Sequence, residues 1–276
     1  MTRVSVNGVC LNVETAGAGT GPPLLLLHGF TGSAANWRAH VEGFAQHFTI
    51  IAVDLPGHGE SDSPDDPARY RMEHCLEDLI AVLDQLQPKL QQVNLLGYSM
   101  GGRVALHFAA AHPERVSKLI LESASPGLSD PAERAARVAS DNALADFIEQ
   151  AGLEAFVDRW ESLPLFASQA RLPAEVSAGL RAQRLLCNPR GLAHSLRGLG
   201  TGIQSPLWDR LPEVRVPTLL IAGELDTKFM NIARAMAESL PNARLEIVPE
   251  AGHTAHLEQP EVFDRLVLDW LSETGD

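Results

Sequence analysis

Cysteine is scarce in this chain of 276 residues, which contains only three. Cys10, Cys75 and Cys187 lie far apart, and none of them belongs to a C-x-x-C pair. An odd number of cysteines with this spacing argues against both a disulfide framework and a zinc site. The sequence also shows no other metal-ligand constellation and no phosphate-cradling glycine loop. We therefore predict that the protein uses neither a metal ion nor a cofactor.

Positive charge is scarce as well. Lysine and arginine together number 22, against 35 aspartates and glutamates, so the formal net charge is −13 at pH 7. No block of basic residues is present, which argues against a nucleic-acid partner and against binding to an anionic membrane. The longest apolar run, 24–27 with its neighbours, is too short to span a bilayer, and the N-terminal residues lack the apolar stretch of a secretion signal. These features predict a soluble, cytoplasmic protein.

Apolar segments alternate with helical patterns along most of the chain. Residues 3–14 alternate apolar and polar side chains around Asn7-Gly8, a type I′ hairpin signal. Six apolar segments are typical of strands buried in a parallel sheet, at 24–27, 49–53, 92–96, 118–121, 218–222 and 244–248. Helical patterns fall between them, at 37–47, 72–86, 99–111, 229–239 and 260–271. This order predicts a doubly wound, mostly parallel sheet with helices on both faces.

The alternation lapses between residues 126 and 208, where helical stretches occur without a convincing buried strand. We interpret this segment as a helical cap inserted between two parts of one core, residues 1–125 and 209–276. Its basic residues are all arginines, whose planar guanidinium suits carboxylate recognition. The plainer interpretation of these arginines is that they pair with acidic side chains on solvated helix faces.

The pentapeptide Gly-Tyr-Ser-Met-Gly at 97–101 is the most informative stretch of the sequence. It follows an apolar run and precedes a helical pattern, which is the context of a nucleophile elbow. A serine hydroxyl is a weak nucleophile and base at neutral pH, so Ser99 needs a histidine to take its proton. Because serine occupies this position, an aspartate nucleophile of the kind used by dehalogenases and epoxide hydrolases is excluded.

The acid and the histidine of a triad should follow the serine in that order, each from a loop after a later strand. Asp226 and His253 satisfy both conditions. Taken alone, Asp226 is typical of a helix cap and His253 of an ordinary loop residue. Their conjunction with Ser99 predicts the triad Ser99, His253 and Asp226, with Glu224 as the alternative acid and His256 as the alternative base.

Negative charge that develops during the reaction needs hydrogen-bond donors. The segment 28–30 ends an early strand, so the backbone N–H of Phe30 can join that of Met100 in an oxyanion hole. His58 precedes the serine within a proline- and glycine-rich turn, and we predict a structural role for it.

The motifs at 97–103, 223–229 and 252–256 resemble those of the α/β-hydrolase superfamily over nearly the whole chain. Within it, they are most similar to the 2-succinyl-6-hydroxy-2,4-cyclohexadiene-1-carboxylate synthases of menaquinone biosynthesis. The elbow is common to many hydrolases. More restrictive features are Arg103 after the elbow, Lys228-Phe229 beside the acid, and the segment 195–202 followed by 207–208.

This resemblance implies an α/β-hydrolase fold and a lyase that eliminates pyruvate from 2-succinyl-5-enolpyruvyl-6-hydroxy-3-cyclohexene-1-carboxylate without hydrolysis. It implies that Ser99, activated by His253 and Asp226, removes a carbon-bound proton. It further implies a polyanionic small-molecule substrate. Positions that match the family's substrate-binding residues are Tyr98, Arg103, Arg134, Trp160 and Arg184.

Two other functions remain open at this point. A serine hydrolase that cleaves esters or carbon–carbon bonds would use the same triad, although a neutral ester gives no reason for Arg103 beside the nucleophile. A ligand-binding receptor with an intact triad and little turnover is a third hypothesis. For all three we expect a monomer or a small homo-oligomer.

Overall fold

The computed structural model describes residues 2–17, 21–86 and 91–273. Its centre is an eight-stranded sheet with the order β1-β2-β4-β3-β5-β6-β7-β8. The strands are β1 (Thr2–Val6), β2 (Val9–Ala16), β3 (Pro23–Leu27), β4 (Thr49–Val53), β5 (Val93–Tyr98), β6 (Val116–Glu122), β7 (Thr218–Gly223) and β8 (Ala243–Val248). β2 pairs antiparallel with β1 and β4, and all the other pairs are parallel. The predicted α/β-hydrolase architecture, with a mostly parallel sheet, is confirmed.

The first two strands form the predicted hairpin. Val6 pairs with Val9, and the two residues between them have positive φ, 46° at Asn7 and 83° at Gly8. Positive φ at both central residues is what a type I′ turn requires.

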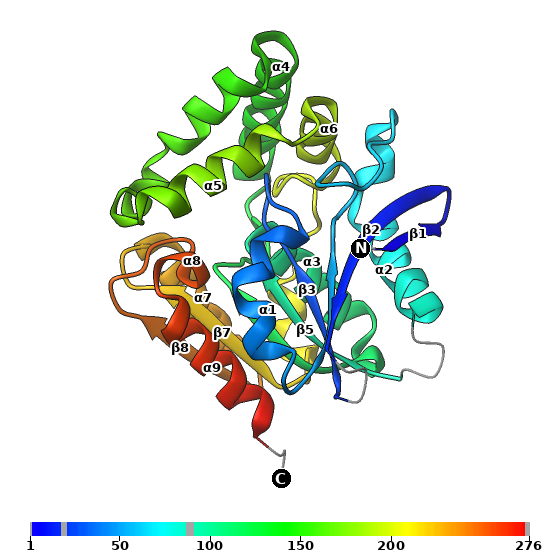
Figure 1. Ribbon diagram of the computed structural model, residues 1–276, viewed down its shortest axis with the longest axis vertical. Coiled ribbons are helices and arrows are strands. Elements are labelled where there is room, and N and C mark those ends of the chain that lie inside the picture. Colours follow the sequence, from blue (N-terminus) through cyan, green and yellow to red (C-terminus); the bar gives the residue numbers. More distant parts are fainter. Residues whose placement is uncertain (1, 18–20, 87–90, 274–276) are drawn as a thin grey trace.

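Helices cover both faces of the sheet (Figure 1). Leu25 and Leu27 of β3 point into a core shared with α2 (Met72–Leu86), α3 (Met100–Ala111) and α7 (Thr227–Ser239). Leu24 and Leu26 point the opposite way, into a core shared with α1 (Arg38–Phe44) and α9 (Pro260–Ser272). Successive strand residues face opposite sides, so an all-leucine strand satisfies two cores at once.

Short helical segments complete the core region. They are η1 (Ala34–Trp37), η2 (Pro67–Tyr70), η3 (Pro113–Arg115), η5 (Trp208–Glu213) and α8 (Ala255–Glu258). The helix predicted at 37–47 is in fact divided into η1 and α1. Ser33 and Asn36 form a capping box on η1, which starts the helical turn earlier than the apolar pattern indicates.

Residues 126–208 are all described, and no strand occurs among them. They form α4 (Pro131–Glu161), η4 (Pro164–Arg171), α5 (Ala174–Leu185) and α6 (Pro189–Leu199), and α4 is kinked at Gly152. Figure 1 shows α4, α5 and α6 gathered at one end of the sheet. They enclose a third, smaller core, to which Phe156 and Leu192 belong. The limits of the cap, 126 and 208, remain a prediction.

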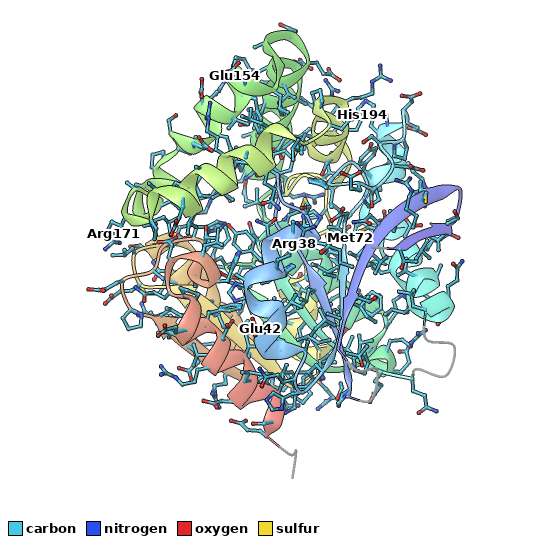
Figure 2. All side chains as sticks on the ribbon, in the orientation of Figure 1. Arg38, Glu42, Met72, Glu154, Arg171 and His194 are labelled. Carbon is cyan, nitrogen blue, oxygen red and sulfur yellow. The ribbon has the colours of Figure 1, made fainter. Side chains whose placement is uncertain are left out.

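The cap lies over the loops that follow the parallel strands. Gln183 of α5 donates a hydrogen bond to Ser33 in the loop after β3, and Gln169 of η4 donates one to Thr254 in the loop after β8. Charged side chains such as Glu154 and Arg171 are exposed at the periphery (Figure 2). None of the helices in the described residues is long and apolar enough to cross a membrane.

Candidate active site

Ser99 occupies a sharp turn between β5 and α3, with φ 51° and ψ −105°. A non-glycine residue rarely adopts positive φ, and such strain is typical of functional positions. The glycines on either side make the turn possible. A Cβ atom on Gly97 would lie 2.4 Å from the carbonyl oxygen of Gly101, and one on Gly101 would lie 2.3 Å from that of Leu27. The predicted elbow is therefore present.

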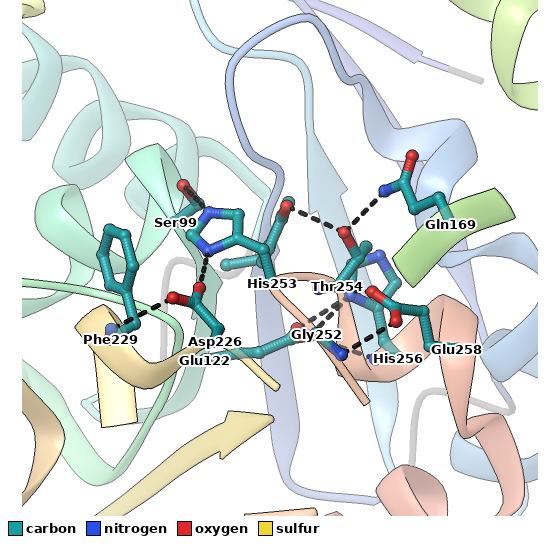
Figure 3. A network of polar contacts seen from close by, with 11 residues as sticks. Ser99, Glu122, Gln169, Asp226, Phe229, Gly252, His253, Thr254, His256 and Glu258 are labelled. Carbon is teal, nitrogen blue, oxygen red and sulfur yellow. Dashed lines mark hydrogen bonds and ion pairs between the residues drawn. The ribbon is translucent and has the colours of Figure 1, made fainter. Parts of the chain in front are cut away.

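The three predicted triad residues form one hydrogen-bonded chain (Figure 3). Ser99 Oγ lies 3.0 Å from His253 Nε2, and His253 Nδ1 lies 2.7 Å from Asp226 Oδ2. His253 and Asp226 are both buried. Asp226 Oδ1 also accepts a hydrogen bond of 3.2 Å from the backbone N–H of Phe229 and caps α7. The helix cap and the predicted triad acid are thus the same residue, because its two oxygens face different partners.

The structure places the two alternative residues elsewhere. Glu224 is exposed, and its carboxylate accepts a hydrogen bond from the backbone N–H of Glu250. His256 is buried with its Nδ1 2.8 Å from the Glu122 carboxylate. Neither side chain hydrogen-bonds to Ser99 or His253, so the geometry does not favour them as the acid or the base.

The two predicted oxyanion donors have free N–H groups. Within the described part of the chain, the backbone N–H of Phe30 and that of Met100 donate to no acceptor. Met100 is the first residue of α3, so its N–H points out of the helix N-terminus, where partial positive charge accumulates. His58 is buried against the Phe30 ring, and burial lowers its pKa to about 3, so it stays neutral. This fits the structural role predicted for His58.

Three of the predicted substrate-binding residues line one small cavity of about 30 Å³ beside the triad, namely Tyr98, Trp160 and Arg184. Phe30 completes its wall, with its ring 5.3 Å from that of Trp160. Arg184 is buried, and its guanidinium lies 2.9 Å from the Glu161 carboxylate. Burial raises the pKa of Tyr98, so its phenol is neutral and hydrogen-bonds to Thr254.

Known proteins resemble this chain over most of its length. A family model described as the alpha/beta hydrolase fold matches residues 22–260. A Bacillus subtilis protein provisionally named 2-succinyl-6-hydroxy-2,4-cyclohexadiene-1-carboxylate synthase is 47% identical over 266 residues, which are 96% of each chain. The chain belongs to this synthase family. A synthase of the same name from Klebsiella pneumoniae is 33% identical and matches 87% of this chain and 89% of its own. The structure of MenH from S. aureus superimposes with a TM-score of 0.89 at 41% identity, covering 95% and 97% of the two chains.

The other two predicted arginines of this synthase-family chain lie apart from the cavity. Arg103, one helical turn after Ser99, donates from Nη1 to the carbonyl of Leu199 and to the side chain of Gln204. Burial lowers the pKa of Arg103 to about 10, so it is still charged at neutral pH. Arg134 Nε lies 3.5 Å from the carbonyl of Gly202. Both arginines therefore contact residues 199–204, at the end of α6 and just after it, whereas Arg184 lines the cavity.

Sequence reasoning assigned no role in the site to several residues around the triad, although two of them, Phe229 and Thr254, belong to the motifs at 223–229 and 252–256. The ring of Phe229 lies 4.5 Å from that of His253, and Phe166 of η4 approaches the same ring at 6.1 Å. Gln169 donates a 2.8 Å hydrogen bond to Thr254, which connects the cap to the loop that carries His253. For Thr254, the only signal in the sequence was its position directly after His253. Phe166 and Gln169 belong to no motif, and their distance from Ser99 depends on how the cap folds.

Proposed function

We propose that this protein eliminates pyruvate from 2-succinyl-5-enolpyruvyl-6-hydroxy-3-cyclohexene-1-carboxylate and releases 2-succinyl-6-hydroxy-2,4-cyclohexadiene-1-carboxylate. Membership of the synthase family supports this reaction. The observation that carries it within the site is the charged, half-buried Arg103 one helical turn from a hydrogen-bonded Ser99–His253–Asp226 chain. A polycarboxylate substrate requires such local positive charge, since the protein as a whole carries −13.

The names of substrate and product define the bonds that change. The substrate ring has one double bond, at C3–C4, and the product ring has two, at C2–C3 and C4–C5. A proton must therefore leave C2, and the C5–oxygen bond must break. His253 takes the hydroxyl proton of Ser99, and Ser99 Oγ takes the proton from C2. The electron pair of the C2–H bond forms the second bond between C2 and C3, and the C3–C4 π pair moves to C4–C5. The C5–oxygen pair leaves with the enolpyruvyl group, which departs as the enolate of pyruvate. The protonated His253 then gives its proton to that enolate, which restores the triad, so water is neither consumed nor released.

Negative charge develops on the succinyl carbonyl oxygen as the C2 proton leaves, because C2 is directly bonded to that carbonyl. The free N–H groups of Phe30 and Met100 are suitable donors for this oxygen. Asp226 holds the ring of His253 with Nδ1 protonated, so that Nε2 is free to accept a proton. Arg103, Arg134 and Arg184 would bind the carboxylates.

The test is pyruvate release from freshly generated substrate in a coupled assay. We expect rapid release by the wild-type protein and none above the spontaneous rate by Ser99→Ala. Arg103→Ala should lower kcat/KM by about a hundredfold, since charged hydrogen bonds contribute roughly 1.5–3 kcal/mol. Arg190→Ala is the matched control, because Arg190 is a cap arginine in an exposed ion pair with Asp65.

The same triad geometry also suits acyl transfer, so a serine hydrolase is the competing function. Absence of pyruvate release, together with hydrolysis of simple esters that Ser99→Ala abolishes, would contradict the lyase and establish the hydrolase. Absence of turnover on either kind of substrate would favour the receptor.

A further inference from the structure

A second buried carboxylate–histidine pair lies beside the triad, and the mechanism above does not use it. Glu122 ends β6, and His256 lies in α8. Their exposed fractions are 0% and 1%. Glu122 Oε2 lies 2.8 Å from Nδ1 of the His256 ring, and Glu122 Oε1 accepts a hydrogen bond of 3.0 Å from the backbone N–H of His256 (Figure 3).

Glu122 also holds the nucleophile elbow. Its backbone carbonyl accepts the N–H of Ser99 at 2.8 Å. One residue therefore fixes the ring of His256 relative to the reacting serine. A histidine that donates from Nδ1 to a carboxylate has a defined ring orientation, which also fixes the position of its other nitrogen, Nε2.

Nε2 of His256 is buried and makes no hydrogen bond within the described part of the chain. His256 lines the cavity of about 30 Å³, and two other residues of that lining also have a buried nitrogen without a partner, Trp160 at Nε1 and Arg184 at Nε. Buried polar groups are nearly always paired, so an unpaired nitrogen on each of three residues that line one cavity indicates a ligand. Indole and guanidinium nitrogens only donate, so the ligand must accept hydrogen bonds.

We propose that His256 binds a carboxylate group of the substrate through Nε2, together with Trp160 and Arg184. This assignment rests on the proposed function. The cavity has room for about two water molecules, which matches the two oxygens of a carboxylate but excludes the substrate ring. In the proposed complex both ring nitrogens of His256 carry a proton, so Nδ1 donates to Glu122 and Nε2 donates to the substrate carboxylate. Arg184 is already paired with Glu161, so a substrate carboxylate in this cavity needs a further donor besides Arg184.

Two substitutions separate the nitrogens of His256. The amide nitrogen of asparagine can replace Nδ1 and keep the bond to Glu122, but it leaves the cavity without a donor. The longer side chain of glutamine can place its amide near the position of Nε2. If Nε2 binds the substrate, His256→Asn should raise KM about tenfold or more, as expected for a charged hydrogen bond, with kcat within about threefold of wild type. His256→Gln should restore a substantial part of this loss in KM.

His40 provides the matched control. It is also 1% exposed, its Nδ1 lies 2.6 Å from Asp264, and its Nε2 has no partner among the described residues, yet His40 does not line the cavity. His40→Asn should therefore leave KM unchanged while perturbing thermal stability as much as His256→Asn does. A wild-type KM in His256→Asn, or equal kinetic changes in the two asparagine variants, would overturn the assignment.

Substrate binding to Ser99→Ala, measured by calorimetry, separates this inference from the proposed function. We expect the Ser99→Ala protein to bind the substrate and the added His256→Asn change to weaken binding about tenfold. If the wild-type protein turns the substrate over but the double variant Ser99→Ala, His256→Asn binds it as tightly as Ser99→Ala does, only the role of His256 is overturned. If the wild type shows no turnover and Ser99→Ala does not bind the substrate, the proposed function and this inference are both overturned.

Discussion

Replacing Asp226 by asparagine should separate catalysis from stability, because its two carboxylate oxygens have different partners. Oδ1 caps α7 by accepting a hydrogen bond of 3.2 Å from the backbone N–H of Phe229, and Oδ2 lies 2.7 Å from Nδ1 of His253. Asparagine has the same shape and is an equally good cap residue. With its oxygen on the cap, its NH₂ group faces His253 Nδ1. Two N–H groups cannot both donate, so the ring proton moves to Nε2, which then cannot accept the proton of Ser99.

The two effects differ greatly in size. Fixing the wrong histidine tautomer lowers kcat by about 10⁴ in enzymes with this triad, or roughly 5.5 kcal/mol of transition-state stabilisation. The cap bond survives in Asp226→Asn, so the melting temperature should change little. Asp226→Ala removes the cap as well, at a cost of about 1 kcal/mol, and should melt roughly 2–4 °C lower than Asp226→Asn. Pyruvate release and thermal unfolding, measured on both variants, provide the comparison.

A kcat above a tenth of the wild-type value in Asp226→Asn would refute this reasoning. Glu224 is the only other acid that the sequence offers in this loop, so the double variant Asp226→Asn, Glu224→Gln should be no slower than Asp226→Asn. A further large loss in the double variant would show that Glu224 substitutes for Asp226, against its position on the exposed side of the loop.

Two further predictions concern stability. Burial lowers the pKa of His28 and of His107 to about 4, so the unfolded chain takes up their protons at higher pH than the folded protein does. The free energy of unfolding should therefore fall as pH drops from about 6.5 to about 4, and His107→Leu should reduce that slope by up to about 1.4 kcal/mol per pH unit in denaturant titrations; an unchanged slope would contradict a neutral buried His107. Gly101→Ala should prevent normal folding, because its Cβ would lie 2.3 Å from the Leu27 carbonyl oxygen. The Cβ of Gly43→Ala in α1 meets no described atom within 4 Å, so this change should raise the free energy of unfolding by about 0.5–1 kcal/mol in the same titrations. Equal effects of the two changes would refute this distinction.

The sequence was sufficient wherever local pattern determines structure. The all-leucine segment of β3 predicted a strand buried on both faces, and Asn7-Gly8 predicted the hairpin, because side-chain periodicity and positive φ are properties of short segments. The elbow was equally readable, since its glycines are required by contacts made within one turn and by the neighbouring strand. Chain order after the elbow then indicated Asp226 and His253.

Only the tertiary structure decided which polar groups meet. His253 and His256 are three residues apart and both follow β8, yet one faces Ser99 and Asp226 while the other faces Glu122. The cap arginines are also alike in sequence, but Arg184 lines the cavity and Arg134 contacts the segment after α6. Such assignments depend on contacts between residues far apart in the chain and on how helices of the cap are rotated over the sheet. Periodicity along the sequence specifies which side of an element is buried, but it does not specify the partner that the buried side meets.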